Sequence, residues 1–396
     1  MKRHIAKKLK KSKVNDIKLS ILFKDFGQLL FTVYEPIIFY QFLGKRIEFV
    51  MIYYGLQSIM YALLARDGAK VMAKIGIKKN MIFATFILIA YNLILLMFAD
   101  RDLSILTSPG ETTIWFAILA ILCSIYQALY WPAFHTDLSL YMENKNSGKD
   151  IGAFYFIDLV SSIIAPVLGG IVLLKAGTSI LIYISVFFIF ISIFPLFKGP
   201  DSKPKVSFTF KEFLGQIFHK QNIKSYLPFF AEGTNAYISS IFWPLFVFSI
   251  ISSVLDLGLL VSGVSLFTAI TVLILGHLLD KNDDAKDKVL KLGVTTSSLG
   301  WLIKGLQTSP ITFFIADNIQ QFGDSVVSIP FEKTMYKRFK DIKSLADEYV
   351  VIREMIYHFS GAFIMFLLAF LIWRFNIIYS AFIIASISYL FYLLMK

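Results

Sequence analysis

Apolar segments of about twenty residues recur along the whole chain, and this pattern constrains the fold more than any other feature. A helix of about twenty residues spans the hydrocarbon core of a bilayer, and only helices or closed barrels satisfy every backbone polar group there. Hydrophobic residues make up 57% of the 396 residues and charged residues 17%, which is more apolar than a typical soluble domain. The sequence therefore predicts an all-α, multi-pass membrane protein.

The apolar segments number twelve and fall into two groups of six. Between the groups lies the longest polar stretch, residues 198–224, which we interpret as a cytoplasmic linker. We expect a basic cytoplasmic tail over 1–20, one six-helix bundle over 21–197 and a second over 225–396. The predicted helices are 21–43, 46–65, 80–99, 113–135, 151–174, 178–197, 225–250, 256–279, 289–307, 311–331, 350–373 and 376–395.

The formal net charge of +12 follows from where the basic residues lie. If the N-terminus is cytoplasmic, only six of the 39 Lys and Arg residues lie on the outer side: Lys45, Arg46, Arg101, Lys175, Lys304 and Arg374. By the positive-inside rule, this asymmetry places both termini in the cytoplasm. It also favours contact with anionic lipid over nucleic-acid binding. We expect a multi-pass protein of the plasma (inner) membrane, with a retained first helix rather than a cleaved signal peptide.

Local signatures of enzymes and cofactor sites are missing from the sequence. It contains no Gly-rich phosphate loop, no H-E-x-x-H, no G-x-S-x-G and no cluster of Cys and His for a metal. The single cysteine, Cys123, excludes an internal disulfide. We therefore expect neither an enzyme nor a cofactor or metal site. Without a nucleotide-binding segment, an ion or solute gradient is the expected driving force.

Polar residues recur at matching positions in the two predicted bundles. Each bundle begins with a helix that carries polar residues on i, i+3, i+7 spacing shortly before a proline, which places them on one helix face. These stripes are Asp25, Gln28, Thr32 and the adjoining Glu35 in helix 21–43, and Glu232, Asn235 and Ser239 in helix 225–250. The fourth and tenth helices carry similar stripes: Ser124, Gln127, Trp131 and His135, and Asp317, Gln321, Asp324 and Ser328.

A carboxylate that faces lipid costs several kcal/mol, whereas one that faces a water-filled cavity costs little. We therefore expect the four stripes to line a central cavity between the two bundles. The predicted cavity residues are Gln28, Thr32, Glu35, Gln127, Trp131, Glu232, Asn235, Asp317, Gln321 and Asp324. Because these stripes contain several acids and almost no base, we expect a negative interior that favours cations or neutral amphiphiles.

Two loops share a pattern. The segment "AKVMAKIGIKK" (69–79) resembles the signature GxxxDRxGRK of the major facilitator superfamily, and "GHLLDK" (276–281) resembles its second copy. The matching residues are Lys74, Gly76, Lys78 and Lys79 in the first loop, and Gly276, Asp280 and Lys281 in the second. Ala73 replaces the aspartate of the first copy. In the family this acid holds the cytoplasmic face closed, so the resemblance implies that role for Asp280, with Arg353 or the nearby helix ends as its partner. The alternative is that Asp280 is a solvated loop acid beside Lys281.

The fifth predicted helix resembles the signature of antiporter members of the same superfamily. The signature positions are filled by Gly152, Ser161, Ala165, Pro166, Gly169 and Gly170. Ser161 and Ala165 replace glycines but stay small, so close helix packing is retained, and Pro166 is able to bend the helix. We expect a closely packed seam between the two bundles on this face. Asp158 lies on the same face as either a gate contact or a proton site.

The resemblance implies two six-helix bundles that surround a central cavity and move by alternating access. Proton coupling requires a group whose proton affinity changes with its surroundings, and a buried carboxylate is such a group because burial disfavours its charged form. The candidates are Glu35, Asp158, Glu232 and Asp324, with His358 as an imidazole alternative. Each of the acids is alternatively a solvated or capping carboxylate that carries no proton. We expect Asp25 and Glu354 to be exposed to water near the inner helix ends, and Lys304 to extend to the outer surface.

Three functions are consistent with these features. The first is proton-coupled export of a small amphiphilic or cationic compound, and the second is proton-coupled uptake of a small metabolite. The third is a transport-inactive membrane scaffold or receptor, for which no large soluble domain is evident. The expected partners are a small-molecule substrate, protons and the lipid bilayer, without nucleic acid. We expect a monomer.

Overall fold

The computed structural model describes residues 2–99, 109–142, 147–198, 201–204, 220–279, 286–341 and 346–394. Every regular element within these ranges is a helix, as the sequence predicts. Seven described segments are long and apolar enough to cross a membrane: Ile47–Ile75, Ile77–Met97, Thr113–Asp137, Phe156–Leu196, Tyr226–Ile251, Val254–Ile274 and Val351–Phe375. The count of twelve membrane-spanning helices therefore stays a prediction.

The chain divides into two compact units. The first comprises Met1–Thr32 and Leu63–Val206, and the second comprises Val33–Ala62 and Ser207–Lys396. Helix α3 (Ile47–Ile75) contributes to both, because its residues up to Ala62 group with the second unit. The predicted bundles, 21–197 and 225–396, differ from this grouping in where the tail 1–20, residues 33–62 and the linker belong, and they remain a prediction.

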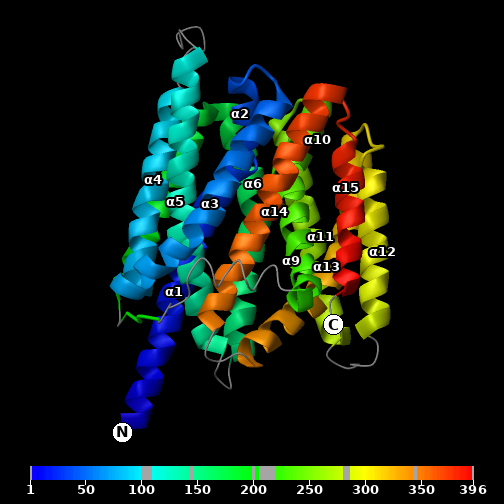
Figure 1. Ribbon diagram of the computed structural model, residues 1–396. Helices are drawn as coiled ribbons and strands as arrows, with labels where there is room; N and C mark the ends of the chain where they lie inside the picture. The colour runs from blue at the N-terminus through cyan, green and yellow to red at the C-terminus, as the bar shows by residue number, and fades with distance from the viewer. Residues whose placement is uncertain are drawn as a thin grey trace. The chain divides into compact units, whose positions relative to one another are not determined.

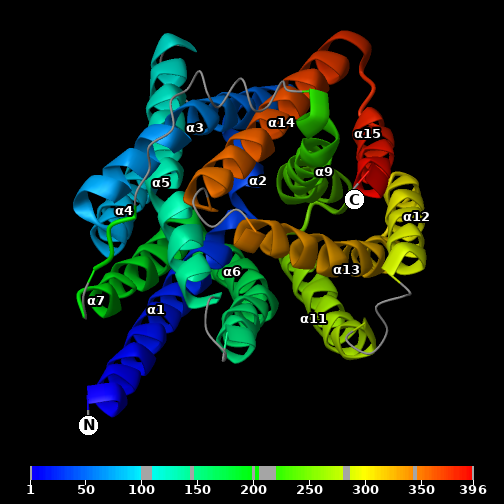
Figure 2. The same cartoon turned by 60° about the horizontal axis from the view of Figure 1, so that its bottom comes forward.

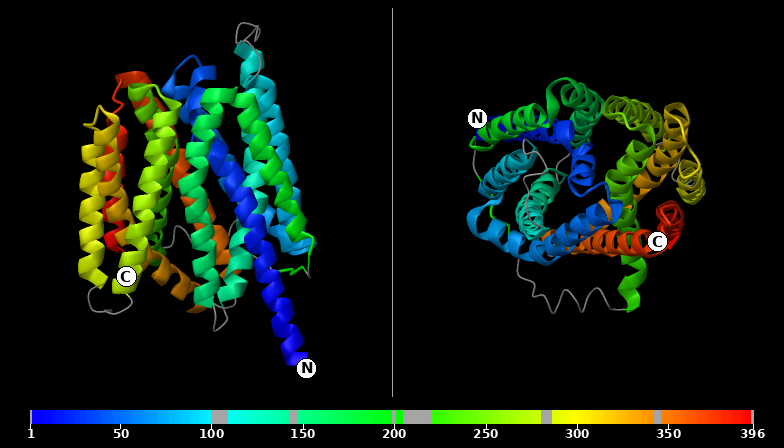
Figure 3. Two further views of the ribbon diagram at one scale, coloured as in Figure 1. Left: turned by 180° about the vertical axis from the view of Figure 1, so that it is seen from behind. Right: turned by 90° about the horizontal axis from the view of Figure 1, so that it is seen from above.

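The first unit is built around the contact of α1 with the long helical segment α6. The segment α6 consists of two helical arms, seen from behind in Figure 3. A turn at Gly177, whose φ of 82° favours glycine, joins them. This break separates the predicted helices 151–174 and 178–197. The helices of the unit are α1 (Lys2–Thr32), the second part of α3, α4 (Ile77–Ala99), α5 (Pro109–Met142), α6 (Ser147–Ile191) and α7 (Ile193–Leu196).

The second unit contains the remaining helices, with α9 next to α14 and α12 next to both α13 and α15 (Figures 1 and 2). Its elements are α2 (Glu35–Phe42), the first part of α3, α9 (Lys220–Tyr237), the π-helical turn η2 (Ile238–Phe242), α10 (Trp243–Ile251), α11 (Val254–Leu279), α12 (Lys286–Lys304), α13 (Pro310–Asp341), α14 (Ala346–Phe375), α15 (Ser380–Ser388) and the 3-10 segment η4 (Tyr389–Leu394).

Two of the predicted helices that carry polar stripes are interrupted. The expected helix 21–43 ends at Thr32 and resumes as α2, after a turn at Val33 and Tyr34. Pro36 lies in the first turn of α2, where its missing N–H would have no helical partner. The expected helix 225–250 contains the π-turn η2 immediately before α10, near Pro244. In both helices, the interruption lies beside the proline that follows the polar stripe.

Glycines set the distance between the helices that carry the polar side chains. A Cβ on Gly233 of α9 would lie 2.2 Å from the Tyr357 carbonyl oxygen of α14. Likewise, a Cβ on Gly300 of α12 would lie 2.6 Å from the Cα of Gln320 on α13. Lipid tails provide no hydrophobic driving force between helices, so dispersion contacts and hydrogen bonds hold the helices together. Both need the backbones to lie close together, as they do at these glycines.

Candidate functional site

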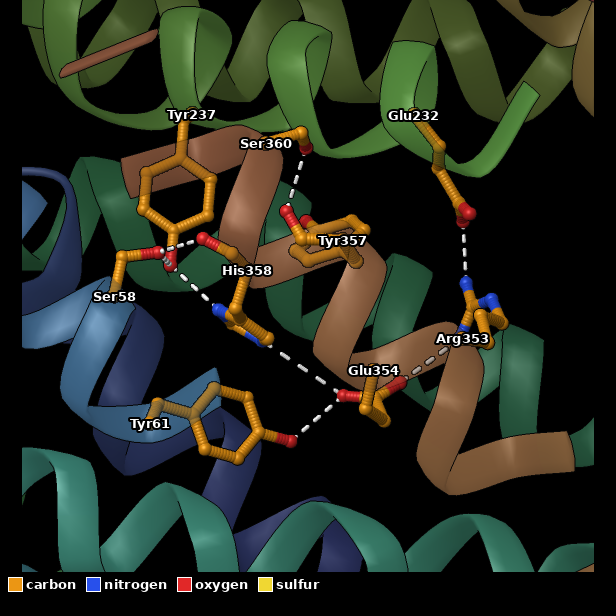
Figure 4. A network of polar contacts seen from close by, with 9 residues as sticks. All are labelled: Ser58, Tyr61, Glu232, Tyr237, Arg353, Glu354, Tyr357, His358 and Ser360. Carbon is orange, nitrogen blue, oxygen red and sulfur yellow. Dashed lines mark hydrogen bonds and ion pairs between the residues drawn. The ribbon is translucent and has the colours of Figure 1, made fainter. Parts of the chain in front are cut away.

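The second unit contains a buried polar network formed by three helices (Figure 4). Ser58 and Tyr61 come from α3, Glu232 and Tyr237 from α9, and Arg353, Glu354, Tyr357, His358 and Ser360 from α14. We call this group the Glu354 network. On α14 its members follow i, i+1, i+4, i+5 and i+7 spacing, so that successive turns present them on one side of the helix.

Arg353 lies between two carboxylates. One end of its guanidinium pairs with Glu232, and the other donates to Glu354 at 3.0 Å. The exposed fractions of the three side chains are 14%, 22% and 7%. Burying these charges is offset only when they are paired and hydrogen-bonded. Glu354 is therefore not the water-exposed acid that the sequence analysis predicts, because Arg353 and Tyr61 replace the water.

His358 links Glu354 to the rest of the network. The Tyr61 hydroxyl donates to Glu354 at 2.7 Å, and the Nε2 atom of His358 lies 3.7 Å from the same carboxylate oxygen. On the other side of the ring, Nδ1 lies 2.6 Å from the Tyr237 hydroxyl. Ser58 contacts both the Tyr237 hydroxyl and the His358 carbonyl oxygen, at 2.6 and 2.8 Å. The network thus connects residues 33–62 with α9 and α14.

A second cluster surrounds Lys304 at the end of α12. Its side chain is 0% exposed, and its ammonium lies 2.6 Å from Asp317 of α13. The same nitrogen lies 4.5 Å from the ring centroid of Trp243 and 4.1 Å from that of Trp301. Trp243 also donates its indole N–H to Asp317 at 3.0 Å. The prediction that Lys304 extends to the outer surface is wrong, because Asp317 and two indole rings hold its charge inside the unit.

Asp324 lies at the end of a hydrogen-bond chain from this cluster. Lys304 donates to the Gln320 side-chain oxygen at 2.8 Å, and the Gln320 amide nitrogen donates to Tyr389 at 3.0 Å. The Tyr389 hydroxyl then donates to Asp324. Asp317 and Asp324, both predicted cavity residues, are thus joined through residues outside the predicted stripe. Gln320 is 1% exposed, whereas the predicted stripe residue Gln321 is partly exposed.

In the first unit, Lys24 of α1 occupies a similar aromatic setting. Its ammonium lies 2.9 Å from Asp25, and 4.2 and 4.6 Å from the ring centroids of Tyr130 and Trp131 on α5. The Lys24 side chain is 2% exposed and Asp25 19%. The predicted stripes of α1 and α5 therefore do meet. Lys24, Lys304 and Arg353 lie beside Asp25, Asp317 and Glu232, so these acids have bases next to them that are not members of the predicted stripes.

The other predicted residues of the first unit are placed as follows. The Tyr126 hydroxyl donates to Gln28 at 3.2 Å, and Thr32 donates to the Gln28 carbonyl oxygen at 2.7 Å. Gln127 is partly buried. Asp158 of α6 is exposed, whereas Ser161, Ala165, Pro166, Gly169 and Gly170 are buried, and the expected seam between the two bundles stays a prediction. Gly152 lies within α6, outside the described side chains.

In the second unit, Tyr54 donates to the Glu35 carboxylate at 3.1 Å, and Asn235 donates to Ser388 at 2.8 Å. Glu232 and His358 belong to the Glu354 network. Gly276 lies in α11 but outside the described side chains, and Asp280 and Lys281 lie outside the described residues. The expected contact between Asp280 and Arg353 therefore stays a prediction, while the described partners of Arg353 are Glu232 and Glu354.

The loop between α3 and α4 is fixed by an acid from outside it. Gly76 has a φ of 106°, and the Asp201 carboxylate accepts the backbone N–H groups of Lys78 and Lys79 at 2.8 and 3.2 Å. The N-terminus of α4 is thereby capped by a negative charge. Lys78 is buried and donates to the Lys198 carbonyl oxygen, whereas Lys74 is exposed. Within the first unit, this loop thus binds the start of the linker.

Comparison with known proteins identifies the family. The family model described as Major Facilitator Superfamily matches residues 19–232, which is more than half of the chain. The chain belongs to the major facilitator superfamily. It is therefore an integral multi-pass membrane protein and a transporter of a small solute rather than an enzyme.

Among solved structures, this superfamily member is similar to a POT family transporter whose crystal structure is in complex with 5-aminolevulinic acid. The two chains share 10% sequence identity, with a TM-score of 0.72 over 96% of this chain and 94% of that chain. At this identity the likeness shows the fold alone. No curated protein sequence matches the chain.

Sequence analysis of this superfamily member named Arg353 and Lys304 but paired neither with its observed acid, and it did not identify Lys24 or the hydrogen-bond partners of these bases. Lys24 and Arg353 each directly adjoin an acid in the sequence, which was the available signal for a local ion pair. Lys304 gives no such signal, because its partner Asp317 is on the next helix. The roles of Tyr61, Gln320 and Tyr389 depend on helix packing, and nothing in their local sequence distinguishes them from other residues of apolar helices.

Proposed function

We propose that the chain couples transport of a small solute to proton movement, and that Asp324 is the carboxylate that carries the proton. The observation that carries this proposal is a difference among the candidate acids. Glu232 is paired with Arg353, and Asp317 with Lys304. Asp324 is partly buried, accepts a hydrogen bond from Tyr389 and has no basic side chain within ion-pair distance among the described residues.

This difference matters because a paired base holds a carboxylate in its ionised form. An acid that is partly desolvated and lacks such a base changes its proton affinity when its surroundings change, as alternating access requires. Glu35 is the next candidate, and its carboxylate accepts a hydrogen bond from the neutral Tyr54 hydroxyl. The Asp158 side chain is more exposed than that of Asp324.

The second candidate for the proton site is His358. Two carboxylates, Glu232 and Glu354, share the Arg353 guanidinium in the Glu354 network. A proton on the His358 ring, 3.7 Å from Glu354, would place a second positive charge beside them. Loss of proton coupling in His358→Gln but not in Asp324→Asn would favour this alternative.

For the overall arrangement, we propose twelve membrane-spanning helices in a plasma membrane, with both termini cytoplasmic and a central cavity between two bundles. The antiporter-like positions in the first arm of α6 favour export of an amphiphilic or cationic compound. Uptake of a small metabolite is the alternative, and the similar transporter with bound 5-aminolevulinic acid makes that compound a useful probe for it. The direction of substrate movement under an imposed pH gradient separates the two.

The first measurement is a thermal-stability screen of purified protein at two pH values, with amphiphilic cations and 5-aminolevulinic acid as probes. A ligand that binds the folded state raises the unfolding temperature, and a pH-dependent increase reports linked protonation. The stabilising compound is then assayed in proteoliposomes. If no compound in a broad panel stabilises the protein, a transport-inactive scaffold or receptor becomes the better interpretation.

The decisive variant is Asp324→Asn, with Asp256→Asn as its matched control, because Asp256 is an exposed acid of α11 in the same unit. We expect Asp324→Asn to reduce accumulation driven by a pH gradient at least about tenfold while substrate exchange without net proton movement continues. Asp256→Asn should retain both activities. Full gradient-driven accumulation in both Asp324→Asn and Glu35→Gln would show that neither acid carries the proton.

A further inference from the structure

We propose that Lys304 is a positioning residue for Asp324, acting through Gln320 and Tyr389. This inference rests on the proposed proton-coupled function and assigns the control of its proton site. It is carried by the direction of the hydrogen bonds, which the chemistry of the four side chains fixes in turn.

The chain begins at a group that has only donors. A lysine ammonium carries three N–H bonds and no acceptor, so Lys304 presents a donor to Gln320, 2.8 Å away. The Gln320 amide must therefore turn its oxygen toward Lys304, which directs its nitrogen to the other side. Lys304 thus fixes which way round the buried amide lies.

The orientation of the Gln320 amide in turn determines the direction of the Tyr389 O–H bond. The Gln320 nitrogen is only a donor, so the Tyr389 oxygen, 3.0 Å away, accepts this bond. The one hydrogen of the Tyr389 hydroxyl is left to point onward, and Asp324 accepts it. All bonds in the chain point toward Asp324, and the Asp324 oxygen at its end is held as an acceptor.

The first donor of the hydrogen-bond chain, the Lys304 ammonium, is held in place. The ammonium of Lys304 is enclosed by Trp243, Trp301 and Asp317, and its side chain is 0% exposed. Gly300, one turn before Lys304 on α12, lies directly against the backbone of Gln320. Gln320 is therefore held within reach of Lys304 by the helix packing itself.

The charged and titratable groups that act on Asp324 come from three elements. Tyr389 and Tyr392 belong to η4, Lys304 belongs to α12, and Asp317, on α13 itself, is paired with Lys304. A donated hydrogen bond and a nearby positive charge both favour ionised Asp324 over its protonated form. Removing any link in the chain should therefore make Asp324 easier to protonate.

The test measures the initial transport rate across a pH series in proteoliposomes. Tyr389→Phe removes the last donor, and the double variant Lys304→Met/Asp317→Asn removes the first donor without leaving an unpaired buried carboxylate. We expect each to move the pH of half-maximal transport upward by about one unit, and the combination of both to move it no further, because the links act in series. Tyr379→Phe and Lys291→Met, which change exposed residues of the same unit, should leave the midpoint unchanged.

A purely structural role for Lys304 would lower the amount of folded protein or the maximal rate without moving the midpoint. Unchanged midpoints in folded Tyr389→Phe and in the double variant would therefore overturn the inference, as would fully additive shifts. Failure of the proposed function is a different result: the unmodified protein would then show no transport driven by a pH gradient.

Discussion

Each unit of the transporter buries a lysine between two aromatic rings and beside an aspartate, but the two arrangements differ in where the aspartate lies. Lys24 pairs with its sequence neighbour Asp25, which is 19% exposed. Lys304 pairs with Asp317, which lies on another helix and is 5% exposed. Lys304 also donates to Gln320, which extends its influence to Asp324.

The difference concerns what each ion pair holds together. Lys24 and Asp25 both belong to α1, so their pairing joins no second helix, and only the contacts of Lys24 with Tyr130 and Trp131 link α1 to α5. The pairing of Lys304 joins α12 to α13, and Trp243 adds the start of α10. A buried ion pair between helices specifies their packing, whereas one within a helix does not.

The largest expected effect follows from Lys304→Met. It leaves the Asp317 charge buried without its base, which should lower the free energy of unfolding by about 3–5 kcal/mol. Thermal unfolding of the purified variant measures this loss. The double variant Lys304→Met/Asp317→Leu removes both charges and should recover most of the stability. A double variant no more stable than Lys304→Met would show that the uncompensated charge is not the cause.

Much of the fold was predictable because its determinants are local. Apolar length alone predicts the helices, and Gly177 separates the predicted helices 151–174 and 178–197 as expected. The turn at Val33 and Tyr34 was not predicted, because an apolar segment with a proline reads equally well as one continuous kinked helix. The grouping of residues 33–62 with the second unit depends on contacts such as Ser58 with Tyr237, which no local pattern indicates.

The polar stripes were predictable as faces of helices but not as sites. Helical spacing correctly indicates that Asp317 and Asp324 lie on one side of α13, since both are connected through Lys304, Gln320 and Tyr389. Helical spacing does not identify a partner on a neighbouring helix. A lysine near a helix end, such as Lys304, is equally consistent with a side chain that extends to the surface and with one buried in an ion pair. Only the packing of α12 on α13 decides between the two.

A smaller effect is expected from Lys24→Met. Because Asp25 remains 19% exposed, water compensates part of its lost partner, and the free energy of unfolding should fall by about 1–2 kcal/mol. The same unfolding measurement on both methionine variants tests the comparison directly. A loss as large as that of Lys304→Met would mean that Asp25 is as poorly solvated as Asp317, and the contrast between the two clusters would disappear.

The smallest effect, and the one that sharpens the comparison most, is expected from Tyr130→Phe. The Tyr130 hydroxyl is buried and has no hydrogen-bond partner among the described residues, whereas the ring that faces Lys24 is retained in phenylalanine. Removing an unsatisfied buried hydroxyl should leave the free energy of unfolding unchanged within about 0.5 kcal/mol, or raise it. Tyr389→Phe is the matched change in the other cluster, and it should cost about 1.5–3 kcal/mol because the lost hydrogen bond is made to a carboxylate. Equal losses in the two phenylalanine variants would show that the hydroxyl of Tyr130 has a polar partner after all, and that both clusters are hydrogen-bonded chains.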